Sequence, residues 1–164
     1  MNRRGFTLIE LVIYILVFAV GVTTIMVMMP QILAKNADST LRLRGIQVAQ
    51  AAMEEILAKK WDETTLNGGG VTTTYSALGH IVDGEGTMSQ YDDVDDYDGL
   101  GVASDTGFNL TAGYTIDVDV IYVIILGNTF AAAGGTSDYK QIKITVDNPD
   151  LDEKYKLYAV KGNF

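Results

Sequence analysis

Residues 5–34 read GFTLIELVIYILVFAVGVTTIMVMMPQILA, and this stretch decides the architecture expected of the chain. No charged side chain occurs between Glu10 and Lys35, which leaves an uncharged run of 24 residues. As a helix this run would be about 36 Å long, more than the roughly 30 Å of a membrane's hydrocarbon core. Apolar side chains would surround the whole helix, which is typical of a helix buried in lipid or inside an assembly. We therefore expect a membrane-spanning helix rather than the core helix of a soluble domain.

The residues before this run set its orientation. Arg3 and Arg4 place the N-terminus on the cytoplasmic side by the positive-inside rule. An ordinary secretory signal peptide has a shorter apolar region followed by a small-residue cleavage site, and neither feature is present here. Glu10 is costly at the start of an apolar span unless it is paired or neutralised. It either lies at the level of the lipid headgroups or pairs with a positive charge on another molecule.

The sequence GFTLIEL at residues 5–11, after a short basic leader, resembles the prepilin motif of type IV pilins and secretion pseudopilins. The resemblance implies that residues 1–5 are a leader peptide, cut between Gly5 and Phe6 by a prepilin peptidase, and that the new Phe6 amine is N-methylated. It also implies that Glu10 pairs with the Phe6 amine of a neighbouring subunit. Residues 6–30 would anchor the chain in the inner membrane and then pack in a filament core.

The rest of the chain, residues 31–164, is expected to be an extracytoplasmic head. Pro30 should kink or loosen the helix, but a helical pattern resumes over residues 31–61 with an apolar stripe. The stripe consists of Ile46, Ala49, Ala52, Met53, Ile56 and Leu57. We predict one long helix from about Phe6 to about Trp61, with Trp61 packing the helix against the head.

Beyond the helix, residues 62–112 are interpreted as a long connection, with a short strand at Val71–Tyr75. Residues 113–164 alternate between apolar and polar side chains in three places, each a strand signature: 114–120, 142–146 and 155–159. We therefore predict an α+β fold of the type IV pilin kind, with the long N-terminal helix packed on an antiparallel sheet of three to four strands. Four lysines are expected on the solvent face of this sheet, opposite Asp117 and Asp119: Lys140, Lys143, Lys154 and Lys156.

Charge is distributed unevenly along the chain. The net charge of −9 combines +3 in residues 1–60, −13 in residues 61–139 and +1 in residues 140–164. This balance argues against nucleic acid as a partner, because neutralising phosphates requires clustered Lys and Arg. The chain has no Cys, which excludes disulfides and Cys-based metal sites.

An acidic cluster at residues 92–98 contains five carboxylates: Asp92, Asp93, Asp95, Asp96 and Asp98. Crowded carboxylates repel one another unless they are solvated or bridged by a cation, and Ca²⁺ prefers oxygen ligands. The spacing does not match an EF-hand loop. Two interpretations remain open, a solvated acidic loop and a Ca²⁺ site. The resemblance adds some support for Ca²⁺, since some pseudopilins use it to hold a loop.

Four further segments resemble minor pilins of the D class from mannose-sensitive haemagglutinin (MSHA) pili: 50–63, 93–100, 113–120 and 140–146. The resemblance implies a minor or major structural subunit of a type IV pilus-like filament that contributes to assembly and adhesion. Its partners would be other pilin subunits, the prepilin peptidase, the inner-membrane assembly platform and, before assembly, lipid. The alternatives are a type II secretion pseudopilin and a membrane-anchored binding domain that never assembles. An enzyme is not expected, because His80 stands alone and no phosphate-binding loop is present.

Overall fold

The computed structural model describes residues 6–66, 69–79, 84–150 and 153–164. The predicted leader, residues 1–5, and the lone His80 lie outside the described residues. The chain divides into two compact units, Met1–Leu41 and Arg42–Phe164.

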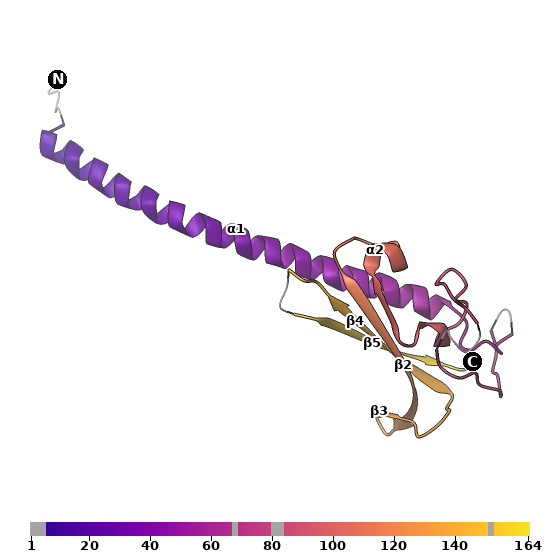
Figure 1. Ribbon diagram of the computed structural model, residues 1–164. Helices are drawn as coiled ribbons and strands as arrows, with labels where there is room; N and C mark the ends of the chain where they lie inside the picture. The colour runs from indigo at the N-terminus through magenta and orange to yellow at the C-terminus, as the bar shows by residue number, and fades with distance from the viewer. Residues whose placement is uncertain (1–5, 67–68, 80–83, 151–152) are drawn as a thin grey trace. The chain divides into compact units, whose positions relative to one another are not determined.

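Helix α1 spans Leu8–Ala58, 51 residues, close to the predicted limits of Phe6 and Trp61. Pro30 lies inside it, and the helix continues on both sides. A proline removes only one backbone donor from the helical ladder, so a long helix can run through it at a local cost. Figure 1 draws α1 as one continuous coil.

The remaining elements belong to the C-terminal unit, Arg42–Phe164. They are a 3-10 helix η1 (Asp95–Tyr97), a short helix α2 (Ser104–Gly107) and five strands: β1 Leu100–Ala103, β2 Thr115–Leu126, β3 Thr129–Ala132, β4 Tyr139–Asp147 and β5 Tyr155–Gly162. The sheet is antiparallel in the order β1-β2-β4-β5, and β3 pairs with the far end of β2 (Figure 1). The predicted antiparallel sheet is therefore confirmed.

The sheet has five strands rather than three to four. The two additional strands, β1 and β3, are only four residues long, too short for alternation to be recognised against a Gly- and Ala-rich background. β3 follows β2 through a tight turn in which Gly127 has a φ of 63°, a backbone conformation that favours glycine. Residues 71–75, predicted as a short strand, form no strand.

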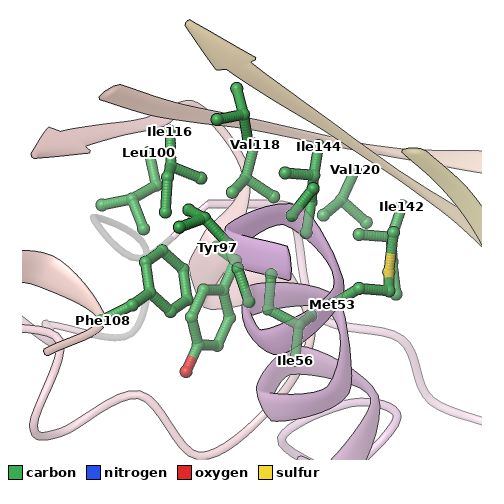
Figure 2. Packing of buried hydrophobic residues seen from close by; sticks show 14 of the residues in the cluster. Met53, Ile56, Tyr97, Leu100, Phe108, Ile116, Val118, Val120, Ile142 and Ile144 are labelled. Atoms are coloured by element: carbon green, nitrogen blue, oxygen red, sulfur yellow. The ribbon is translucent and has the colours of Figure 1, made fainter. Parts of the chain in front are cut away.

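The core lies between the second half of α1 and one face of the sheet. Figure 2 shows Met53 and Ile56 of α1 beside Ile142 and Ile144 of β4, with Tyr97 next to them. Ala49, Ala52, Met53 and Ile56 are buried as predicted, whereas Ile46 and Leu57 are 41% and 37% exposed. The buried face is centred on Ala52 and Ile56, which places Ile46 and Leu57 at its margins. Trp61 is buried beyond the helix end, as expected.

Candidate functional site

The N-terminal end of α1 is organised by Thr7 and Glu10. The Thr7 hydroxyl accepts a hydrogen bond from the backbone N–H of Glu10 at 3.4 Å, which satisfies one of the unpaired donors of the first turn. Glu10 lies in this first turn, where its negative charge is favoured by the helix dipole. The spacing Thr-x-x-Glu is that of a capping box, and the sequence analysis missed the capping role of Thr7.

The Glu10 carboxylate makes no ion pair with any residue of the described ranges. Phe6 is 74% exposed, and its ring contacts Tyr14 edge-on with the centroids 6.0 Å apart. Gly5, the predicted cleavage residue, lies outside the described residues. The Phe6 side chain is thus accessible to a partner molecule.

Within the described residues, α1 is the one helix long and apolar enough to cross a membrane. Most large apolar side chains between Leu8 and Leu33 are more than half exposed. So large an apolar surface marks a site of contact with lipid or protein. This helix is consistent with membrane anchoring.

The acidic cluster is not a solvated loop. Asp93 and Asp95 are fully buried, and Asp96 is 2% exposed. The segment folds inward because Val94 and Tyr97, both fully buried, insert into the core around η1. The interpretation of residues 92–98 as a solvated acidic loop is therefore wrong for these three carboxylates.

Four of the five carboxylates hold the local backbone or a lysine. Asp93 Oδ1 accepts the N–H groups of Asp95 (2.6 Å) and Asp96 (3.3 Å), while Asp96 Oδ2 accepts those of Asp92 (3.0 Å) and Asp93 (3.1 Å). Asp98 Oδ1 accepts the N–H of Val120 at 2.8 Å, which ties the loop to β2. Asp92 Oδ2 pairs with Lys60 Nζ at 2.6 Å, and the hydrogen bond from Lys60 lowers the pKa of Asp92.

The fifth carboxylate, Asp95, pairs with Lys140. Its Oδ1 lies 2.5 Å from Lys140 Nζ, and both side chains are fully buried. Burial raises the pKa of Asp95 to about 8 although Lys140 opposes the shift. Lys140 was predicted on the solvent face, and this prediction is wrong. In β4, Lys140 has the same parity as the buried Ile142 and Ile144, so the period of the strand itself points it inward.

Of the other lysine predictions, the partner of Lys143 is confirmed and the partner of Lys154 is wrong. Lys143 Nζ pairs with Asp119 Oδ2 at 2.6 Å across the β2–β4 register, as predicted. Lys154 pairs with Asp147 at 2.8 Å rather than with Asp117 or Asp119. Lys154 flanks the turn that joins β4 to β5, and this position brings it to the end of β4.

Two overlapping groups of carboxylates have the geometry to hold a metal ion. One is Glu63, Asp92 and Asp93, and the other is Glu85, Asp92 and Asp96, each with one oxygen per residue within 4.8 Å of the others. Three buried oxygens here accept no N–H or O–H hydrogen bond from the described residues: Glu85 Oε2, Asp92 Oδ1 and Asp93 Oδ2.

The pKa values of this region show the cost of crowding carboxylates. Burial and the adjacent Asp96 carboxylate raise the pKa of Glu85 to about 7. Burial and the same Asp96 raise the pKa of Asp93 to about 6. A cation would remove this repulsion, and the oxygen-only donor set suits Ca²⁺. The sequence analysis missed Glu63 and Glu85, which lie 29 and 7 residues before Asp92 and carry no local signal.

Residues 1–26 match the family model described as the prokaryotic N-terminal methylation motif. The match covers Gly5, Phe6 and Glu10, and it supports a type IV pilin-like or pseudopilin-like protein that is processed by a peptidase and assembled into filaments. No curated protein and no solved structure matches the chain significantly.

Proposed function

We propose that this chain is a structural subunit of a type IV pilus-like filament, anchored in the inner membrane before assembly. The observation that carries the proposal is the methylation motif at residues 1–26, joined to a half-helix whose large apolar side chains are mostly exposed. The C-terminal unit then faces the extracytoplasmic side, and it acts as a structural module rather than as an enzyme.

Assembly uses Glu10 and the Phe6 amine. After cleavage behind Gly5, the Phe6 amine is a cation at the start of an apolar helix. In the low-dielectric filament core, the Glu10 carboxylate of one subunit and this amine of another would each neutralise the other's charge. The exposed apolar surface of α1 supplies the packing area around this pair.

Within this class we favour a minor pilin of the D class of MSHA pili, a subunit that aids pilus assembly and surface adhesion. The support is the resemblance of residues 93–100 and 140–146, together with the motif. The alternative is a type II secretion pseudopilin, whose filament drives protein export. Immunogold labelling of sheared surface fibres separates the two, because labelled fibres at native expression support the pilus and their absence supports the pseudopilin.

Two variants test the filament function. Gly5→Ala should block processing, which intact-protein mass spectrometry detects as a retained leader. Glu10→Ala should leave the protein in the membrane but strongly reduce its incorporation into filaments. Glu54→Ala, an exposed change in the second half of the same helix, is the matched control and should assemble normally. Normal cleavage of the first variant or normal incorporation of the second would contradict the proposal.

We also propose that the C-terminal unit binds Ca²⁺ through Asp92 with Glu63, Asp93, Glu85 and Asp96. The support is the three buried oxygens without donors and the two groups that share Asp92. Asp95 and Asp98, candidate ligands from the sequence, are engaged by Lys140 and by the N–H of Val120 instead. Bound Ca²⁺ would supply positive charge that holds the connection between α1 and β1 against the sheet.

Thermal unfolding of the full chain in detergent tests this site. Millimolar Ca²⁺ should raise the melting temperature relative to a chelator, since a ligand that binds only the folded state stabilises it. Asp92→Asn and Glu85→Gln should abolish the rise, and Asp119→Asn, on the outer face of β2, should retain it. No Ca²⁺-dependent rise in the unsubstituted protein would exclude the site.

A further inference from the structure

Lys140 lies in an enclosed site built from four segments of the C-terminal unit. Its Nζ donates a hydrogen bond to the carbonyl oxygen of Trp61 at 2.7 Å and lies 3.9 Å from the centre of the Trp61 ring. Asp62 Oδ2 lies 3.4 Å from the same nitrogen. The ring of Tyr122, directly opposite Lys140 in the β2–β4 pairing, is centred 5.4 Å away. Lys140 and Asp62 are both fully buried, so solvent is excluded from the nitrogen.

Asp95 presents a carboxyl group to this nitrogen at reacting distance. Oδ1 lies 2.5 Å from Nζ. Because a carboxyl C–O bond is about 1.25 Å long, Nζ is no farther than about 3.8 Å from Cγ, close to the separation of a near-attack geometry. Apart from the contact with Lys140, neither oxygen of Asp95 has a hydrogen-bond partner in the described ranges. Nothing in those ranges therefore competes with Lys140 for this carboxyl group.

We propose that Lys140 Nζ and Asp95 Cγ become joined by an amide bond after folding, an intramolecular cross-link between η1 and β4. The ammonium and the carboxylate condense to an amide and one water molecule. The N–Cγ bond forms and one Cγ–O bond breaks; two of the three ammonium hydrogens leave with the departing oxygen. No oxidant, metal or second protein is required, and water is the one by-product.

Asp62 is positioned to move the protons. The N–H groups of Thr64 and Ser76 bond to its carboxylate at 3.0 and 2.8 Å, which orients it and keeps it charged. It can take a proton from Nζ, leaving a neutral amine that attacks Cγ, and return that proton to the departing oxygen. Burial favours the reaction because an ion pair without water is costly, whereas a neutral amide is not. Fixed neighbours also supply a high effective concentration of the two reactants.

The cross-link would join the connection between α1 and β1 to the sheet. Asp95 belongs to the connection between α1 and β1, whereas β4 is a central strand of the sheet. The sequence has no Cys, so no disulfide can make such a connection. An amide closes the same loop and is insensitive to reductants.

Mass spectrometry of the purified full chain, denatured before digestion, tests the proposal. Trypsin cannot separate the two residues, because residues 61–139 contain no Lys or Arg. Chymotrypsin cleaves after aromatic residues, and Tyr97 follows Asp95 while Tyr139 precedes Lys140. The expected product is a branched peptide joining these two segments, lighter by one water than their sum. Recovery of both segments as separate linear peptides of full mass would overturn the proposal.

Three variants sharpen this test. Lys140→Arg should contain no branched peptide, since a guanidinium is not an effective nucleophile. Lys143→Arg, at an outward-facing position of the same strand, is the matched control and should contain as much branched peptide as the unsubstituted chain. Asp62→Asn should form much less of it while remaining folded by near-ultraviolet circular dichroism. Full cross-linking in folded Asp62→Asn would refute the proton-relay role, and a branched peptide in Lys140→Arg would refute the assignment of the nitrogen.

Discussion

The two halves of α1 have the same backbone conformation and opposite relations to their surroundings. From Leu8 to Leu33 most large apolar side chains are exposed, whereas in the second half Ala52 and Ile56 have no exposed surface. The exposed apolar surface of the first half is suited to contact with lipid or with protein. The second half has its partner in the same chain, the inner face of the sheet. The sequence of α1 therefore specifies a helix along its whole length, whereas the contacts of each half depend on what lies beside it.

The largest expected effect comes from removing a buried charged residue of the C-terminal unit. The apolar half of α1 offers no comparable substitution, because it has no charged residue between Glu10 and Lys35. Lys140→Met should destabilise this unit by about 3–5 kcal/mol, because Asp62 and Asp95 would remain buried without the nitrogen that both contact. Denaturant unfolding of the full chain in detergent, followed by tryptophan fluorescence of the buried Trp61, measures the change. Lys143→Met should leave the unfolding midpoint unchanged. A Lys140→Met midpoint equal to that of the control would show that the buried charges are compensated elsewhere.

A matched pair of substitutions in α1 tests the comparison directly. Ile56→Ala should cost about 2–5 kcal/mol, because it removes a fully buried side chain and leaves a cavity. Ile15→Ala, at a position that is 60% exposed, should not change the unfolding of the C-terminal unit. The same fluorescence measurement applies to both. Equal effects of the two substitutions would show that the halves of α1 are not energetically distinct.

The smallest expected effect is a dependence on pH. The pKa of Asp93 is about 6 in the folded chain, against an ordinary value of about 3.9 when unfolded. Between these values the folded chain binds more protons, so stability should fall as pH rises, by about 2–3 kcal/mol in total. Melting temperatures in chelator at pH 4.5 and pH 7 measure the fall, which should be smaller in Asp93→Asn; the raised pKa values of Glu85 and Asp95 account for the part that remains. Added Ca²⁺ should reduce it, since a cation replaces the proton; an unchanged fall would count against Asp93 as a ligand.

Several parts of the fold could be predicted from local pattern alone. The helix limits were close to Phe6 and Trp61 because an uninterrupted apolar run and an amphipathic stripe both have helical signatures. The long strands β2, β4 and β5 followed from alternation. The short strands β1 and β3 could not be predicted, since four residues pair only because β2 lies beside them.

The candidate sites likewise contain residues that a local pattern identifies and residues that only folding brings together. Gly5, Phe6 and Glu10 lie within six consecutive positions, so a linear motif contains them all. Glu63 and Glu85 are separated from Asp92 along the chain, and only folding places an oxygen of each within 4.8 Å of an Asp92 oxygen. The burial of Lys140 is an intermediate case, because the parity of β4 places this residue inward, whereas its charge led to the wrong prediction of the solvent face.

The order of residues by itself determined the long helix, its apolar N-terminal half and the processing motif, since each depends on neighbours within a few positions along the chain. Only the tertiary structure decided which carboxylates are buried and which lysine each one meets. The physical reason is that a charged side chain is buried only when a partner compensates its lost hydration. The distance between two such partners in space does not follow from their separation along the chain.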